Sequence, residues 1–131
     1  MTLYIDTTQG HNIEIVVKKG ENRLAKKKFS AKYRQAEKLL PEIKKILDKN
    51  NLELSNIEKI QVVNKGTDKT SFTALRIGVV TANALGYALG VPVIGCRMSD
   101  VGCRKVAVKK KRFNIVEPIY CKEPNITLLS Q

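Results

Sequence analysis

The segment SFTALRIGVVTANALGYALGVPVIGC, residues 71–96, decides the fold of this chain. Its pattern predicts a helix from Ser71 to Leu89 and a strand from Val91 to Gly95. The helix is apolar nearly all the way round and carries one charge, Arg76. A helix of that kind is buried on more than one side. We therefore expect the rest of the chain to be arranged around it.

Small residues recur at every fourth position of this helix and form a ridge with almost no side chain. Each glycine inside a helix costs about 1 kcal/mol relative to alanine, so the close approach of another backbone must offset that cost. Bulkier residues fill the remaining surface. The ridge consists of Ala74, Gly78, Ala82 and Gly86.

Three explanations of the apolar helix stay open on the residues alone. One is that its second face binds a partner, because a chain this short has little with which to cover it. Another is ordinary burial inside one domain. The third is a membrane span, for which about 20 apolar residues suffice, although Arg76 and Asn83 lie within the helix and weaken this explanation.

The composition indicates one folded domain with an anionic partner. The chain has 131 residues, of which 43% are hydrophobic, and this excludes a disordered chain. Its net charge of +12 favours nucleic acid. With 5% aromatic residues and no Trp, we expect phosphate contacts rather than base stacking. The candidate RNA phosphate contacts, which a solvated charge run explains equally well, are Lys109, Lys110, Lys111 and Arg112.

The N-terminus and the cysteines point to a cytoplasmic protein without a metal. Residues 1–6 contain no basic region of the kind that begins a signal peptide, so we expect a cytoplasmic location and no membrane association. Cys96, Cys103 and Cys121 form no C-x-x-C pair, and His11 is the single histidine. This spacing fits no zinc site. We expect reduced thiols, no metal and no cofactor.

Alternating and periodic patterns give the order of the other elements. Strands are expected over residues 3–6, 11–18 and 23–29, then a helix over 31–50 and a strand over 57–63. The lysines of the third strand suit an exposed sheet edge. With the central helix and its strand the order is β-β-β-α-β-α-β, and two crossovers make the last strands parallel to the first. This predicts an RNase H-like α/β domain with a basic C-terminal extension.

Several segments together resemble the bacterial TsaB (YeaZ) family, which has the actin-like ATPase fold. SFTALRIG at residues 71–78 resembles the family's G-P-G-S-F-T-G-x-R-x-G motif. LYIDTT at residues 3–8 resembles its opening I-D-T-S, and EKLLPEIKKIL at residues 37–47 resembles its first helix with an internal proline. EPIYCKEPNIT at residues 117–127 resembles its C-terminal P-x-Y-x-R-x-P, with Lys122 in place of the usual arginine.

The resemblance implies a function and a partner. TsaB-like proteins are the non-catalytic partners of TsaD in making threonylcarbamoyl-adenosine at position 37 of transfer RNAs. They contact TsaD through the two helices of the N-terminal domain, packed as a four-helix bundle, and they homodimerise through the same surface when alone. The resemblance therefore implies a scaffold subunit that is not itself an enzyme, in a heterodimer with a TsaD-like catalytic subunit or in a homodimer.

The chain departs from the family in its second domain and in its glycine motif. A usual member carries a second α/β domain of similar size. Here we expect a TsaB-like domain over residues 1–96 and only a reduced remnant or tail over residues 97–131. Asp68, Lys69 and Thr70 replace the G-P-G. These departures argue against a glycine-loop role, and we expect no interdomain nucleotide cleft within one chain.

We expect the partner interface on the two helices, while other classes of function stay open. One is a stand-alone basic RNA-binding domain with direct tRNA contact. Another is an ATPase or sugar-kinase half-domain in which Asp6 faces a phosphate at a strand end; a capped turn is the alternative role of Asp6. The predicted interface residues are Leu39, Leu40, Ile43, Leu47, Phe72, Leu75, Arg76, Val79 and Asn83.

Overall fold

Three antiparallel strands form the first part of the sheet because two glycines supply the turns between them. Gly10 and Gly20 have φ values of +65° and +63°, a left-handed conformation that costs glycine little. The register pairs Ile5 with Ile15, so apolar residues of neighbouring strands lie on the same face. The three strands are β1 (Thr2–Gln9), β2 (Asn12–Lys19) and β3 (Asn22–Ser30).

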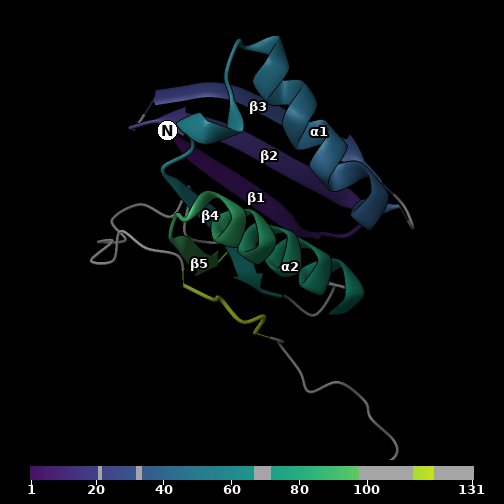
Figure 1. The fold of residues 1–131 in the computed structure, drawn as a ribbon. Helices are drawn as coiled ribbons and strands as arrows, with labels where there is room; N and C mark the ends of the chain where they lie inside the picture. The colour runs from purple at the N-terminus through teal and green to yellow at the C-terminus, as the bar shows by residue number, and fades with distance from the viewer. Residues whose placement is uncertain (21, 32–33, 67–71, 98–113, 120–131) are drawn as a thin grey trace, which may run out of the picture.

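Two crossover helices complete the sheet. Helix α1 (Gln35–Lys49) leads from β3 to β4 (Lys59–Lys65), and helix α2 (Phe72–Leu89) leads from β4 to β5 (Val93–Arg97). Strand β4 is parallel to β1 and β5 is parallel to β4, in a sheet of order β3-β2-β1-β4-β5. Both crossovers lead in the same direction across the sheet, and such connections are right-handed. Both helices therefore lie on the same face, as Figure 1 shows, and the predicted element order is confirmed.

The fold is taken from a computed structural model that describes residues 1–20, 22–31, 34–66, 72–97 and 114–119. The backbones of Phe72 and Arg97 are described, but their side chains are not. A short 3-10 turn, η1 (Leu54–Asn56), lies between α1 and β4.

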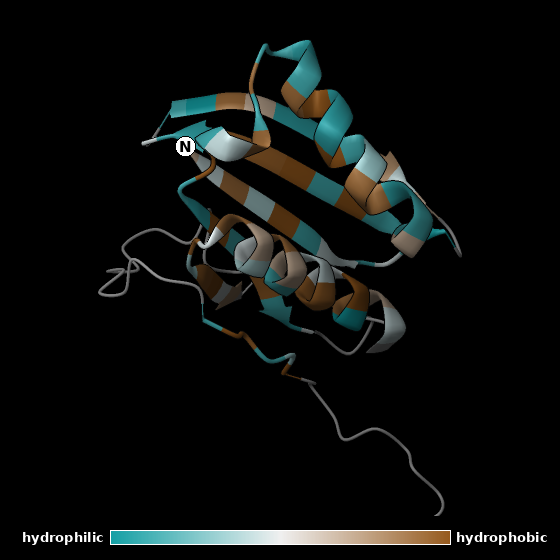
Figure 2. Cartoon of the chain, in the orientation of Figure 1, coloured by the Kyte–Doolittle hydropathy of each residue, from teal (hydrophilic) through white to brown (hydrophobic). Residues whose placement is uncertain are grey.

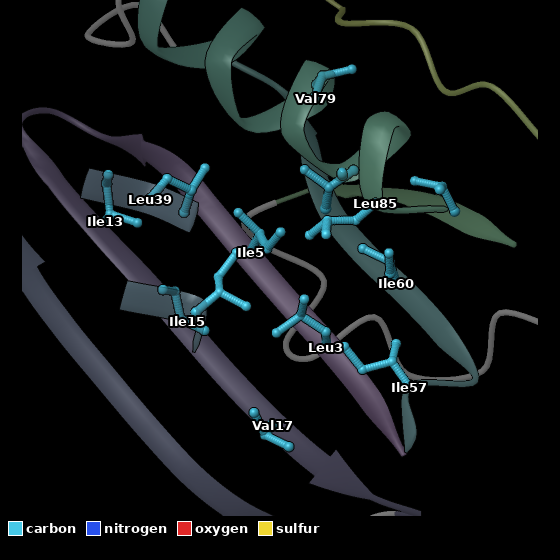
Figure 3. Close-up of a cluster of buried hydrophobic side chains, with 14 of the residues drawn as sticks. Leu3, Ile5, Ile13, Ile15, Val17, Leu39, Ile57, Ile60, Val79 and Leu85 are labelled. Atoms are coloured by element: carbon cyan, nitrogen blue, oxygen red, sulfur yellow. The ribbon is translucent and has the colours of Figure 1, made fainter. Parts of the chain in front are cut away.

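The main hydrophobic core lies between the helices and the sheet. Leu3 and Ile5 point toward the helices because strand side chains alternate between the two faces. They share one buried cluster with Leu39 of α1 and Val79 of α2 (Figure 3). The largest fully buried side chains include Leu3, Ile5, Ile13, Ile15, Leu39, Ile43, Leu47, Ile60 and Leu75.

The opposite face of the sheet carries a smaller buried cluster, which includes Tyr4 and Val16. Burial raises the pKa of the Tyr4 phenol well above its usual range, and the negative charges of Asp6 and Glu14 act in the same direction. The Lys18 ammonium lies 5.3 Å from the centroid of the Tyr4 ring. Tyr4 is therefore a neutral, packed side chain at physiological pH.

Helix α1 begins later than the sequence pattern predicts. The helix was expected from residue 31, and it begins at Gln35. Ala31 instead continues the strand pairing, because its amide donates a hydrogen bond to the carbonyl oxygen of His11 at 2.8 Å. Arg34, at the N-cap position, makes no side-chain capping bond. The pairing of β3 with β2, rather than a capping residue, thus sets the start of α1.

An extended segment, residues 114–119, packs against α2 and β5. The side-chain amide of Asn83 makes two hydrogen bonds to the backbone of Val116. Its Nδ2 donates to the Val116 carbonyl oxygen at 2.8 Å, and its Oδ1 accepts from the Val116 backbone N–H at 3.0 Å. Asn114 binds the backbone of Val93 in the same way, at 2.7 and 3.2 Å. Val116 is buried and joins the main core. One flank of α2 is therefore covered by the chain itself.

Cys96 differs from the expectation of reduced thiols. It is disulfide-bonded in this structure, so the expectation is wrong at this position.

A separate observation concerns the membrane-span explanation of α2. In the described part of the chain, no helix is both long and apolar enough to cross a bilayer.

Candidate partner interface on helix α2

The small-residue ridge of α2 faces the sheet of the same chain. Ala74, Gly78, Ala82 and Gly86 are all buried. Thr7 of β1 donates a hydrogen bond from Oγ1 to the Ala74 carbonyl oxygen at 2.7 Å. A Cβ atom at Gly78 would lie 2.3 Å from Thr7 Oγ1 and 3.0 Å from its Cγ2. The ridge therefore lets α2 approach β1 closely, and it is not a surface for a partner.

Most of the predicted interface residues are buried in the chain's own core, which corrects the prediction. Both helices lie on one face of the sheet and contact each other. Their bulky apolar side chains are consequently used between the helices and the sheet. The residues concerned, each exposed by 1% or less, are Leu39, Ile43, Leu47, Leu75 and Val79.

The other four predicted residues differ from one another. Leu40 is 48% exposed on α1, and Arg76 is exposed on α2. Asn83 uses its amide to hold the backbone of Val116, so it serves the domain itself. The side chain of Phe72 lies outside the described residues. Leu40 and Arg76 thus remain candidates for contact with a partner.

A second stripe of α2 points away from the sheet, and the sequence prediction missed it. Val80 is 64% exposed and Tyr87 is 77% exposed. They follow the three- and four-residue spacing of one helix side. We call this set the outer stripe of α2: Thr73, Arg76, Val80, Ala84, Tyr87 and Ala88, all of them exposed.

The outer stripe has little charge, in contrast to the surface of α1. Figure 2 shows α2 mainly in white and brown, whereas α1 carries several hydrophilic bands. Arg76 is the single charged residue in α2. Because α2 is apolar all round, its sequence offers no contrast between a buried side and an exposed side. That is why the periodicity could not identify the outer stripe.

Asp6 is held within its own turn. Its Oδ1 accepts hydrogen bonds from the backbone amide of Thr8 at 2.8 Å and from the Thr8 hydroxyl at 2.6 Å. Its Oδ2 accepts a hydrogen bond from the side-chain nitrogen Nε2 of Gln9 at 2.6 Å. The Asp6 side chain is fully buried. This geometry favours the capped turn over a carboxylate that faces a phosphate.

Two other predictions concern metal binding and the candidate RNA contacts. Across the described ranges, no group of three or more His, Cys, Asp and Glu side chains is placed to hold a metal ion. The candidate RNA contacts, residues 109–112, lie outside the described residues and stay a prediction.

The fold and the sequence together place the chain in a family. A β-β-β-α-β-α-β domain with this strand order and both helices on one face has the RNase H-like fold of the actin-like ATPase superfamily. The family model of TsaD, described as tRNA N6-adenosine threonylcarbamoyltransferase, matches residues 29–113, which is more than half of the chain. The chain belongs to this family.

Two solved structures have the same fold. YeaZ from Pseudomonas aeruginosa matches with a TM-score of 0.67 and 23% identity, over 79% of this chain and 48% of YeaZ. A crystal structure described as an uncharacterized protein with similarity to peptidase YEAZ, from the same organism, also gives 0.67 and 23%, over 80% of this chain and 48% of that one. The fold implied by the resemblance to TsaB (YeaZ) is confirmed.

A curated relative is similar in sequence over a shorter stretch. This protein, described as "Uncharacterized protein ML0378" of Mycobacterium leprae (strain TN), is 36% identical over 69 residues. The match covers 52% of this chain and 18% of the relative. The chain therefore spans a small part of this relative and about half of the two solved structures.

Proposed function

We propose that this chain is a non-catalytic scaffold subunit of the machinery that makes threonylcarbamoyl-adenosine in transfer RNA. In this proposal residues 1–96 form a docking domain for a TsaD-like catalytic subunit, and the complex works in the cytoplasm. Membership of the TsaD family supports a place in tRNA modification. The TsaB-like motifs support the scaffold role. The observation that carries the docking surface is the exposed, nearly uncharged outer stripe in a chain of net charge +12.

The outer stripe has the chemistry of a helix-packing surface. Val80 and Tyr87 expose most of their side chains to water, and apolar groups gathered on one side of a helix are typical of protein interfaces. Tyrosine is also enriched among the residues that dominate binding energy. Ala84 and Ala88 lie beside them and allow another helix to approach closely. A helical partner surface fits this pattern.

Helix α1 contributes to the same surface through Leu40. Glu42 contacts Lys27 of β3, so its side of α1 faces the edge of the sheet. Leu40 is two residues earlier, which is about 200° away around the helix. It therefore lies on the side of α1 that faces α2. Two helices from each subunit would form a four-helix bundle, and a standard interface buries about 1,600 Å² in total.

The docking proposal is tested with Val80→Arg in the full chain. Light scattering would measure the mass of the chain alone and mixed with a purified TsaD-like catalytic subunit. We expect the wild-type chain to form the heterodimer, and to form a homodimer when alone. Val80→Arg should weaken both by at least about tenfold, because an unpaired charge would be buried in the interface.

The matched control is Leu24→Arg, which adds the same charge at a residue that is 43% exposed on β3. This variant should associate like the wild type. A folded Val80→Arg variant that binds with wild-type affinity would refute docking through the outer stripe. A separate transfer assay tests the scaffold role: threonylcarbamoyl transfer by the lone chain would show that it is an enzyme.

A further inference from the structure

The excess positive charge lies on one side of the described fold. The described residues between positions 12 and 49 include 11 Lys or Arg and four Asp or Glu, whereas the remaining described residues include four of each kind. Positions 12–49 form β2, β3 and α1. Figure 1 shows these elements toward the edge of the sheet that is opposite β5. The net charge of the described chain therefore belongs to one flank.

The edge strand β3 presents a row of basic side chains on the face away from the helices. Strand β3 pairs with β2 alone in the described sheet. Arg23, Lys26 and Lys28 are all exposed. Lys26 and Lys28 are two residues apart, a separation of about 6.8 Å along a strand, which is comparable with the spacing of successive phosphates in an extended RNA strand. The paired residues in β2 are Lys18, Val16 and Glu14, respectively.

One side of α1 carries further lysines at the same edge of the sheet, on the opposite face from this row. Glu42 accepts a hydrogen bond from Lys27 of β3, which brings that side of the helix next to the edge strand. Lys38, Lys45 and Lys49 are exposed and lie four residues before, three after and seven after Glu42, on the same helix side. We call the following set the basic flank: Arg23, Lys26, Lys28, Lys38, Lys45 and Lys49.

Among the described residues, ion pairs neutralise only part of this charge. Lys26 lies 3.5 Å from a Glu14 oxygen, and Lys45 lies 3.5 Å from a Glu42 oxygen. Arg23 and Lys28 have no ion-pair partner among the described residues. Unpaired like charges repel one another, and an anion that binds between them relieves this repulsion. The flank is thus suited to a partner with regularly spaced negative charges.

We propose that the basic flank binds the phosphate backbone of RNA. Within the function proposed above, it would hold tRNA while the outer stripe of α2 docks the catalytic subunit. The choice of tRNA rests on that proposed function, whereas phosphate binding does not. An anionic membrane fits less well, because membrane-surface helices insert large apolar side chains and Leu24 is the single large apolar side chain exposed on β3.

The two surfaces belong to different parts of the fold. The outer stripe lies on α2, between β4 and β5 in the chain, and the basic flank lies on β3 and the side of α1 that faces it. One chain can therefore contact a protein partner and an RNA at the same time. A scaffold with two such surfaces would bring the RNA to the catalytic subunit.

The test measures binding of a fluorescently labelled tRNA transcript to the full chain by anisotropy, over a salt series from about 50 to about 200 mM. Each phosphate contact contributes about 0.7–0.9 to the slope of log affinity against log salt. The double variant Arg23→Gln, Lys28→Gln should therefore lower the slope by about 1.5 and the affinity by at least about tenfold. Thermal melts would show that this double variant and its control, described next, remain folded.

The matched control is the double variant Lys59→Gln, Lys65→Gln, which removes the same charge from β4. It should bind tRNA within about twofold of the wild type if the flank is the site. Equal loss in both double variants would mean nonspecific attraction and would overturn the proposal. Unchanged binding in the flank variant, with loss on neutralising residues 109–112, would also overturn it.

Two further comparisons separate this proposal from its alternatives. Binding to phosphatidylserine vesicles without binding to tRNA would replace RNA by a membrane as the partner and refute the proposal. The Val80→Arg variant should retain tRNA binding, and the flank variant should retain docking of the catalytic subunit. Failure of docking with retained RNA binding would refute the scaffold role and leave the flank as an RNA site.

Discussion

The contact between Gly78 and Thr7 allows a quantitative test of how α2 is seated on the sheet. Replacing Gly78 by alanine is usually favourable inside a helix, by about 1 kcal/mol. In this structure the added methyl group would lie 2.3 Å from Thr7 Oγ1. The substitution should therefore destabilise the protein, against the general preference of helices for alanine.

The expected magnitude follows from three terms. Rotating the Thr7 side chain relieves the clash only in part, because its Cγ2 and Cβ atoms are already 3.0 and 3.2 Å from the same point, and the rotation moves Oγ1 away from the Ala74 carbonyl oxygen. Overpacking a buried contact costs about 1–3 kcal/mol. Loss of the hydrogen bond from Thr7 to the Ala74 carbonyl oxygen adds about 1 kcal/mol, which the gain in helix propensity roughly cancels. Gly78→Ala should therefore lower the free energy of unfolding by about 1–3 kcal/mol.

Urea unfolding of the full chain measures this change in a double-mutant cycle with Thr7→Ala. Removing both branches of Thr7 makes room for the methyl group, so the double variant should be more stable than the sum of the single effects predicts. We expect a favourable coupling of about 1–2 kcal/mol. The control is Ala84→Gly on the outer stripe, where glycine should cost about 1 kcal/mol through propensity alone.

Two results would refute this reasoning. One is a Gly78→Ala variant that is more stable than the wild type by about 1 kcal/mol. This result would mean that the helix propensity of alanine alone determines the change in stability. The other is additivity of Gly78→Ala and Thr7→Ala, which would mean that the two side chains do not compete for the same space.

Two further predictions concern Glu42 and Asn83. The hydrogen bond from Lys27 lowers the pKa of the Glu42 carboxyl, so its contribution to stability is present above the unfolded pKa of about 4.3 and is lost as the pH falls through the folded value. Urea unfolding should show Glu42→Gln to be about 0.5 kcal/mol less stable than the wild type at pH 7, and a difference that persists in strong acid would contradict this cause. Asn83→Ala leaves the Val116 amide and carbonyl without their partner, so we expect a loss of about 1–3 kcal/mol and faster hydrogen exchange of the Val116 amide; unchanged exchange would contradict the role given to Asn83.

The elements and their order follow from local patterns. Strand side chains alternate with a period of two and helix side chains with a period of 3.6, and these periods locate the five strands and two helices of the described residues. The direction of β4 and β5 then follows from the handedness of crossovers. The start of α1 does not follow from these patterns, because the pairing of Ala31 with His11 extends the sheet. Tertiary pairing overrides the local helix signal at this boundary.

The candidate surfaces were predictable only in part. The lysines of β3 suit an exposed edge on sequence grounds. Their continuation along α1 depends on the contact between Glu42 and Lys27, which brings two elements together. The asparagines that hold residues 114–119 gave no signal, because Asn83 binds a backbone 33 residues away in the chain. Contacts of that kind depend on the folded geometry and not on any local period.

The sequence by itself determined that α2 is buried on more than one side, that a strand follows it, and that the chain has the RNase H-like fold. Only the tertiary structure decided which side of α2 meets the sheet. The reason is physical: a helix that is apolar all round has no amphipathic contrast, so burial alone does not choose among its sides. The choice rests on the fit of Gly78 against Thr7, and this fit leaves Val80 and Tyr87 exposed on the outer stripe.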